Sequence, residues 1–272
     1  ISMYNALISA CAKKGDANTA EKWLKRMLDR NIEADVVSYS TVIHACAKSS
    51  ELTRAEAWMA RMTSAGVHGN SITYNTLINV CARVGDADRA EGWLSKMEDA
   101  GCEPGVLSYN SVINACAKAG ECARAEQWLQ RMRSRGLSPD SVSYSTVIHA
   151  CVKAHQLMRS ENWLREMVDA GEPFSAFCHD SVIQACAHAG QLHRAEHWLK
   201  EALKHGGSLN PNSFTSLISR CARSGELDKA AQWLAEMEKH TAVPAAVYQL
   251  VAACQGRTGK ADRSRELPHK SS

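Results

Sequence analysis

One short segment has the residue types of a zinc site, with two imidazoles one helical turn apart and a carboxylate beside them: His193-Arg-Ala-Glu196-His197. In some zinc peptidases a similar pattern on a helix holds the metal and activates a water molecule. The Ala-Glu pair, however, recurs at Ala20-Glu21, Ala55-Glu56, Ala90-Glu91 and Ala125-Glu126. Only the two histidines are particular to this segment. We therefore interpret it as a solvated helix face and predict no metal site, no catalytic residue and no enzyme activity.

The eleven cysteines are the second group that could do chemistry. They are too dilute among 272 residues for a secreted disulfide scaffold. No two of them are spaced Cys-x-x-Cys, as a zinc or thiol-redox motif would require. Most share a helical phase with apolar neighbours, which predicts buried thiols in a reducing compartment and no cofactor.

The tryptophans and most of the cysteines define the organisation of the chain. Each series has a spacing of 35 residues, at Trp23, Trp58, Trp93, Trp128, Trp163, Trp198 and Trp233, and at Cys11, Cys46, Cys81, Cys116, Cys151, Cys186 and Cys221. A fixed period of this size predicts a stacked array of structural repeats. We predict one array over 1–272, with full repeats at 1–35, 36–70, 71–105, 106–140, 141–175, 176–210 and 211–245, a partial eighth repeat at 246–267 and a frayed tail at 268–272.

Each repeat is predicted to form two helices. In the fourth repeat, apolar residues at positions 4, 7, 8 and 11 form one stripe of a helix expected over 107–119, and Gly120 provides its stop. The second helix is expected over 122–135, and Pro139 prevents its continuation. No period-two alternation occurs, so the predicted fold class is all-α, an α-solenoid of helical hairpins.

The second helix has three recurring features. Its tryptophan shares a face with Ala, Leu and Met and is expected in the core, with stacking on a bound base as the alternative. The Glu at position 21 is expected on a solvated helix surface. The same surface is expected to carry the cations at position 26, which are Arg26, Arg61, Lys96 and Arg131.

Charge and hydropathy exclude some classes of protein. The formal net charge of +3 does not by itself indicate a nucleic-acid partner. No apolar run is long enough to span a membrane, and no pocket motif indicates a small-molecule substrate. No signal or transit peptide is visible and the chain does not begin with Met, so a fragment or processed product is expected.

The period and two segments of the fourth repeat resemble pentatricopeptide repeats. The segments are Tyr109-Asn-Ser-Val-Ile-Asn-Ala-Cys-Ala-Lys-Ala-Gly120 and Arg131-Met-Arg-Ser-Arg-Gly-Leu-Ser-Pro-Asp140. The resemblance covers residues 1 to about 265, and the uniform spacing is similar to the P-type class. One departure is the second-helix pattern Ala-Glu-x-Trp-Leu-x-x-Met, where the family more often has Leu and Phe. The resemblance implies a right-handed α-solenoid that binds single-stranded RNA, one base per repeat.

The resemblance also implies that the fifth and thirty-fifth residues of each repeat contact the base. The fifth residues are Asn5, Ser40, Asn75, Asn110, Ser145, Asp180 and Thr215, and the thirty-fifth are Asp35, Asn70, Gly105, Asp140, Ser175, Asn210 and Ala245. First-turn helix chemistry is the alternative role for the fifth residues. Two assignments stay open, because Phe174 competes with Ser175 and Asn212 with Asn210.

By resemblance, these pairs also imply base preferences. The pairs Asn5–Asp35 and Asn110–Asp140 favour U, and Ser40–Asn70 favours A. The family's parallel polarity then gives a target beginning 5′-U-A-N-U.

Two further positions complete the implied RNA site. Residues at position 2 would sandwich the base, although partial burial against the next repeat is an alternative: Val37, Ile72, Leu107, Val142 and Phe177. Cations at position 13 would contact phosphate, although a helix C-terminus also favours a cation: Lys13, Lys48, Arg83, Lys118, Lys153 and Arg223. Helix geometry places positions 2, 5, 9 and 13 about 100° to 180° from the core position 4, on one continuous face.

Three functions follow as hypotheses. The leading one is a sequence-specific single-stranded RNA-binding protein that acts in the stability, processing or translation of organellar transcripts, in a mitochondrion or chloroplast. The second is a scaffold that binds protein partners as a peripheral subunit of a large organellar complex. The third is the RNA-targeting part of an enzyme whose catalytic domain lies outside these residues.

Overall fold

The computed structural model describes residues 1–205 and 209–254, and this part of the chain contains helices and connecting turns but no strand. The all-α prediction is therefore confirmed. Residues 245–254 are also helical and begin the partial eighth repeat. The rest of that repeat and the tail expected to fray lie outside the described residues. The labelled helices are α1 (Ser2–Lys14), α2 (Ala17–Asp29), α3 (Val36–Lys48), α4 (Leu52–Ser64), α5 (Ser71–Val84), α6 (Ala87–Asp99), α7 (Val106–Ala119), α8 (Cys122–Ser134), α9 (Ser141–Lys153), α10 (Leu157–Asp169), α11 (Ala176–His188), α12 (Leu192–Lys204), α13 (Pro211–Ser224) and α14 (Leu227–His240).

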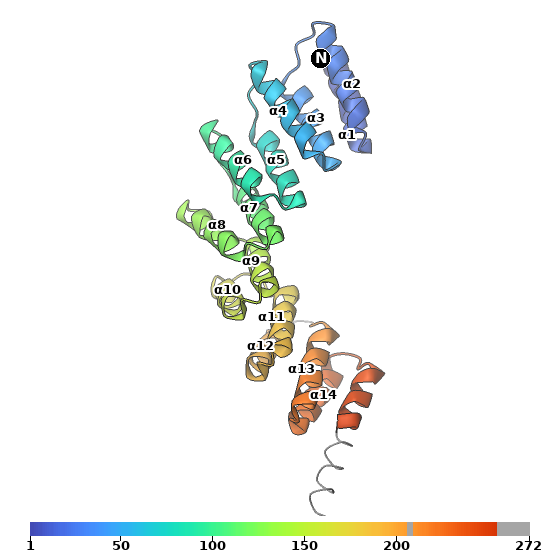
Figure 1. Ribbon diagram of the computed structural model, residues 1–272, viewed down its shortest axis with the longest axis vertical. Helices are drawn as coiled ribbons and strands as arrows, with labels where there is room; N and C mark the ends of the chain where they lie inside the picture. Colours follow the sequence, from blue (N-terminus) through green and yellow to red (C-terminus); the bar gives the residue numbers. More distant parts are fainter. Residues whose placement is uncertain (206–208, 255–272) are drawn as a thin grey trace, which may run out of the picture. The chain divides into compact units, whose positions relative to one another are not determined.

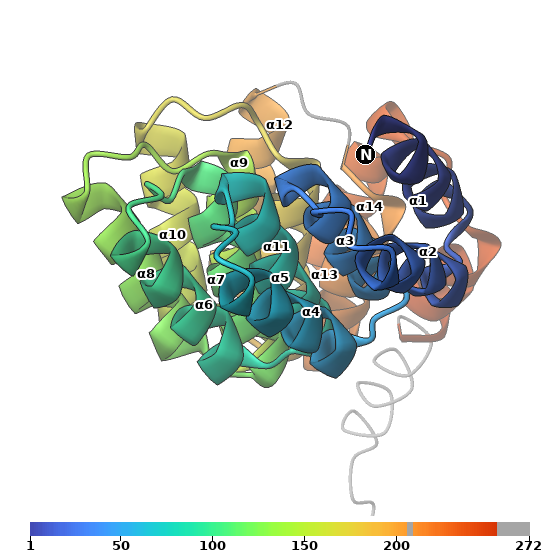
Figure 2. The ribbon, with the colours of Figure 1, turned by 90° about the horizontal axis from the view of Figure 1, so that it is seen from above.

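The chain forms two compact units, Ile1–Ala150 and a second that begins at Cys151. In the first unit, the first helices of successive repeats, α1, α3, α5 and α7, pack against one another (Figure 1). The second helices α2, α4 and α6 each pack between the first helix of their own repeat and that of the next repeat, as α6 does between α5 and α7. The odd-numbered and even-numbered helices of this unit thus form two layers (Figure 2). In the second unit, α11 and α13 pack together and α12 packs on both.

The core repeats with the period of the sequence. In the fourth repeat, Tyr109, Val112, Ile113 and Cys116 from α7 are buried, as the spacing of their apolar stripe predicts. The tryptophans belong to the same layer: Trp58 is buried, and its ring lies 6.4 Å from that of Tyr39. Trp93, Trp163, Trp198 and Trp233 are buried as well, as core packing predicts, whereas Trp23 and Trp128 are half-buried.

The turn inside each hairpin requires a left-handed backbone at repeat position 15. Gly120 has φ of 81° there and ends α7, as predicted. Two repeats place other residues in the same conformation, Ser50 with φ of 60° and His155 with φ of 56°. A residue with a Cβ is strained in this region, whereas glycine is not.

Changing His155→Gly should therefore raise the free energy of unfolding by roughly 0.5–1 kcal/mol, because relief of the left-handed strain exceeds the added entropy of the unfolded chain. Urea unfolding followed by circular dichroism measures the change. Gly120→Ala is the matched control with the opposite sign. Equal or lower stability of the His155 variant would contradict this account of the turn.

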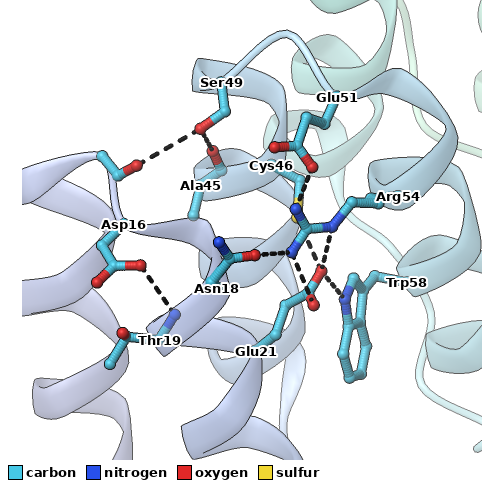
Figure 3. Close-up of polar contacts among 11 residues, drawn as sticks. Asp16, Asn18, Thr19, Glu21, Ala45, Cys46, Ser49, Glu51, Arg54 and Trp58 are labelled. Carbon is cyan, nitrogen blue, oxygen red and sulfur yellow. Dashed lines mark hydrogen bonds and ion pairs between the residues drawn. The ribbon is translucent and has the colours of Figure 1, made fainter.

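The second helices are joined by a polar ladder that the sequence interpretation missed (Figure 3). Glu21 on α2 accepts hydrogen bonds from Trp58 Nε1 at 2.8 Å and Arg54 Nε at 3.1 Å, both on α4 of the next repeat. Only 13% of the Glu21 side chain is exposed. The same arrangement recurs where Glu91 meets Arg124 and Trp128, and where Glu161 meets Arg194.

One prediction about the second helix is corrected by this ladder. The position-21 glutamates do not lie on a solvated helix surface, because they link adjacent repeats. The position-26 cations are exposed, as predicted. They also lie over tryptophan rings of their own helix, with Lys96 Nζ 4.1 Å and the Arg131 guanidinium 4.8 Å from the ring centres. Long side chains thus bridge helices whose backbones are too far apart to pack directly.

Candidate functional site

A groove lies on the first-helix layer of the first unit, where three successive repeats meet. Its volume is about 420 Å³. Asn75 lies in it from position 5, Ile72 and Leu107 line it from position 2 of successive repeats, and Lys48 and Arg83 line it from position 13. Asn79 lines it from position 9, so the four positions that helix geometry places on one face share one concave surface.

In two repeats the predicted base-contacting pair is joined directly. Asn5 Nδ2 donates to the carboxylate of Asp35 at 3.2 and 3.3 Å. In the fourth repeat Asn110 Nδ2 donates to Asp140 Oδ1 at 3.0 Å. Both aspartates also cap the helix that follows, since Asp35 accepts from the backbone N–H of Ser38 at 2.8 Å. The thirty-fifth residue is thus both a helix cap and the neighbour of the fifth residue.

These hydrogen bonds keep both carboxylates ionised. Partial burial acts to raise the pKa of Asp35, but the hydrogen bonds from Ser38 and Asn5 outweigh it and the net pKa is lowered. Burial, Ser143 and Asn110 act in the same way on Asp140, whose pKa is also lowered. Asp180 differs, because burial dominates and its pKa is raised. The first and fourth repeats therefore offer an ionised, acceptor-only group beside an amide.

The remaining pairs are arranged differently. Asp180 accepts from the backbone N–H of Asn210 at 3.1 Å. Ser40 and Thr215 instead donate to carbonyl oxygens of their own helices. This is first-turn helix chemistry, the role given above as the alternative to base contact. Ser145 also donates within its helix, to Val142 O at 3.2 Å, and its predicted partner Ser175 belongs to the other unit.

Helix caps define the structural register of the thirty-fifth residue in the two repeats where it was open. Ser175 is the N-cap of α11, and Asn210 is the N-cap of α13 with Pro211 at the first helical position. They occupy the place that Asp35 and Asn70 hold before α3 and α5. Phe174 and Asn212 lie outside this place, which leaves Ser175 and Asn210 in the predicted register.

The position-2 side chains are exposed. Their exposed fractions are 57% for Val37, 71% for Ile72, 64% for Leu107, 57% for Val142 and 58% for Phe177. Less than half of the surface of each of these residues is therefore covered. Their apolar surface faces solvent beside the position-5 side chains and is available to a flat, apolar ligand surface.

The position-13 cations contact the preceding repeat. Lys48 Nζ donates to Lys13 O at 3.1 Å, and Lys118 Nζ donates to Arg83 O at 3.3 Å. Arg83 donates to Ala47 O at 3.0 Å and Ser50 Oγ at 2.9 Å. These contacts match the helix-terminus alternative, yet an ammonium group that donates once keeps two further N–H donors, so phosphate contact remains compatible.

In the second unit a similar hollow of about 320 Å³ is lined by Thr215 at position 5, Arg223 at position 13 and Arg220. His188 lies there at the position where other repeats have a fixed cation. Outside this face, His193 and His197 are exposed. Among residues 1–205 and 209–254, no group of three potential metal ligands comes together, and no helix is long and apolar enough to cross a membrane.

One set of site residues escaped the sequence interpretation. Ser38, Ser108, Ser143 and Ser213, at position 3 of their repeats, are fully buried. Each donates from Oγ to the fifth residue of the preceding repeat, with O–O distances of 2.6 Å to Asn5, 2.6 Å to Asn75, 2.5 Å to Asn110 and 2.5 Å to Asp180. The sequence signal that could have identified them is the recurrence of a hydroxyl residue at position 3, in the first turn of the first helix.

The geometry defines a class of protein: an α-solenoid whose first helices carry a surface of alternating amides, exposed aliphatic groups and cations. The family model described as the pentacotripeptide-repeat region of PRORP matches residues 2–176, and the PPR repeat model matches residues 177–207 and 213–241. The chain belongs to the pentatricopeptide-repeat family. No curated protein matches it.

Solved structures share the fold at low sequence identity. The pentatricopeptide repeat protein PPR10 from maize has 22% identity and a TM-score of 0.62 over 94% of this chain, and this chain covers 42% of the maize chain. The PPR domain of Arabidopsis thaliana protein-only RNase P 1, solved in complex with tRNA, has 16% identity and a TM-score of 0.60 over 73% of this chain, and 98% of that domain is covered. PPR10 has also been solved with an 18-nt psaJ RNA element.

Proposed function

We propose that the chain binds single-stranded RNA along the first-helix face, with one base at each repeat. The observation that carries the proposal is the groove at the third repeat. There the amide of Asn75, the exposed aliphatic groups of Ile72 and Leu107, and the cations of Lys48 and Arg83 line one groove. A base needs a polar edge contact and two apolar faces, and its phosphates need cations, so this combination suits a nucleotide.

The relatives support the same chemistry. The structures of PPR10 and of the protein-only RNase P 1 domain contain an RNA element and tRNA respectively. We propose that the present chain acts on organellar transcripts by covering a single-stranded segment. A covered strand neither folds nor enters a nuclease, which would alter RNA stability, processing or translation. The role proposed for these residues is binding rather than catalysis.

Selection from randomised RNA tests the function, and salt-dependent binding of the selected sequences measures its electrostatic part. We expect an enriched motif that begins U-A-N-U. If six position-13 cations contact phosphates, log K should fall against log salt with a slope of roughly −4. A selection without enrichment, combined with the absence of a salt slope, would exclude RNA as the ligand and favour a protein occupant of the groove.

A single amide tests the base assignment. Asn110→Ala should lower the preference for U at the fourth base roughly tenfold or more, because one good base-edge contact discriminates by about 1–3 kcal/mol. The aspartate cap of α9 is retained in this variant, since Ser143 N still donates to Asp140 at 2.9 Å.

Asn162→Ala, on the exposed face of α10, is the matched control. Fluorescence anisotropy with four RNAs that differ only at the fourth base gives the four affinities. A uniform loss over all four RNAs would contradict the assignment.

A second candidate function is the RNA-targeting region of a larger enzyme. It is favoured by the match of residues 2–176 to the family model of the PRORP repeat region. A similar structure, the PPR domain of protein-only RNase P 1, was solved in complex with tRNA. A comparison of folded tRNA with an unstructured RNA of equal length distinguishes the two. Tighter binding of tRNA favours the second candidate, and tighter binding of the unstructured strand favours the first.

A further inference from the structure

The amide of Asn110 lies within hydrogen-bond distance of a carboxylate, which only accepts, and of a hydroxyl, which can donate or accept. Asp140 Oδ1 lies 3.0 Å from Nδ2, and Ser143 Oγ lies 2.5 Å from Oδ1. An ionised carboxylate only accepts hydrogen bonds, so the NH₂ end of the amide must face Asp140. The carbonyl end must then face the hydroxyl. The distance of 2.5 Å agrees, because it is short for N–H···O and normal for O–H···O.

The same arrangement occurs in the first repeat, where Ser38 Oγ lies 2.6 Å from Asn5 Oδ1 and the amide nitrogen lies 3.2 Å from Asp35. The third repeat has Gly105 in place of the aspartate. There Ser108 Oγ, 2.6 Å from Asn75 Oδ1, is the polar contact shown for that amide. The hydroxyl is therefore common to all three asparagine repeats, whereas the aspartate is not.

We propose that the buried hydroxyl at position 3 of the following repeat is a positioning residue, which holds the carbonyl oxygen of the position-5 asparagine inward and leaves its NH₂ group to donate to the base. This deepens the proposed RNA-binding function and rests on it. An amide free to rotate by 180° accepts as well as donates, and so discriminates poorly between base edges. An amide held by its oxygen offers only N–H and selects bases that present an acceptor.

Burial makes the hydroxyl effective in this role. The side chains of Ser108 and Ser143 are fully buried, at 0% exposure, so water does not compete for the amide oxygen. Position 3 also tolerates a larger hydroxyl residue, because Thr73 occupies it in the third repeat and is equally buried. Serine to threonine therefore keeps the hydroxyl, and serine to alanine removes it with little change in volume.

Base preference in four variants tests the proposal. Ser143→Ala should reduce the preference for U at the fourth base about threefold, because Asp140 still holds the amide nitrogen. Ser108→Ala should leave the third base unselected, as in the wild type, so its effect is measured on the amide of Asn75, which lacks a carboxylate partner. Ser143→Thr and Ser108→Thr should keep the wild-type preferences within twofold. The salt slope should be the same in all four, since no cation is changed.

A measurement without RNA separates this inference from the proposed function. In nuclear magnetic resonance spectra of the free protein, ¹⁵N relaxation of the Asn75 NH₂ group should be that of a rigid side chain in the wild type and in Ser108→Thr. In Ser108→Ala the relaxation should show added internal motion as the amide reorients about Cβ–Cγ. Unchanged NH₂ relaxation in Ser108→Ala, or an unchanged preference for U in Ser143→Ala, would overturn the positioning role. Wild-type protein with a rigid Asn75 amide but no base preference at any site would instead refute the proposed function.

Discussion

Replacing Lys48, Arg83 and Lys118 together with glutamine should weaken binding to every single-stranded RNA alike. Three lost phosphate contacts reduce the salt slope by about 2, which corresponds to a roughly 50-fold loss of affinity at 0.15 M salt if the electrostatic part vanishes near 1 M. Glutamine is chosen because its amide can still donate to the carbonyl oxygens that Lys48 and Lys118 cap at 3.1 and 3.3 Å. The variant thus removes charge while retaining a donor.

The control changes three cations that are exposed on second helices: Lys22, Lys25 and Arg165 to glutamine. It alters the net charge equally but leaves the groove intact, so it should change the affinity and the slope far less. Binding measured from 0.05 to 0.5 M salt gives both quantities. Equal losses in the two variants would show a non-specific charge effect. An unchanged slope in the groove variant would show that these cations serve only as helix caps.

The second large effect is expected from Glu161→Ala, which opens the ladder between the fifth and sixth repeats. Glu161 Oε1 accepts from Arg194 Nε at 2.9 Å and from Cys186 Sγ at 3.4 Å, and 9% of the side chain is exposed. Its removal leaves a guanidinium without its main partner in a half-buried place. The free energy of unfolding should fall by about 3 kcal/mol. Glu103→Ala, an exposed glutamate, should change it by less than about 0.5 kcal/mol.

The same residue gives the stability a pH dependence. Burial acts to raise the pKa of Glu161, but the hydrogen bonds and charge of Arg194, with the Cys186 contact, lower it below its ordinary 4.5. A carboxylate with a lowered folded-state pKa contributes stability above its unfolded pKa, and that contribution is lost as the pH falls through the folded value.

Wild-type protein should therefore lose more stability than Glu161→Ala when the pH is lowered from about 6 to below 4. Urea unfolding at a series of pH values measures the difference between the two. Parallel pH profiles would contradict the ladder's electrostatic role.

Much of the fold could be predicted from single repeat positions, because each position occurs once in every one of the seven full repeats. The recurrence of Trp58 and its equivalents fixed the period, and the stripe containing Tyr109 and Ile113 indicated the buried face. The hairpin stop at Gly120 followed from the chemistry of glycine. These are local properties, and helix periodicity alone determines them.

The errors came from side chains whose partners lie in another repeat. Glu21 looked like a solvated surface residue because its own helix offers no partner, yet Arg54 and Trp58 of the next repeat enclose it. The fraction of each position-2 aliphatic that its surroundings cover also follows only from the structure, in which Ile72 is 71% exposed. Contacts at separations of 33 to 37 residues, such as those of Arg54 and Trp58 with Glu21, leave no periodic signal within one helix.

The sequence by itself determined the family, the helical hairpin and the face that carries positions 2, 5, 9 and 13, because all three depend on periodicity along one chain segment. The tertiary structure decided which groups on that face meet. It joined Asn110 to Asp140 and set Ser143 behind the amide, and it placed Ser175 and Asn210 at helix caps. The physical reason is that the direction in which an amide donates depends on atoms of the neighbouring repeat. Only the packing of one repeat on the next brings those atoms within hydrogen-bond distance.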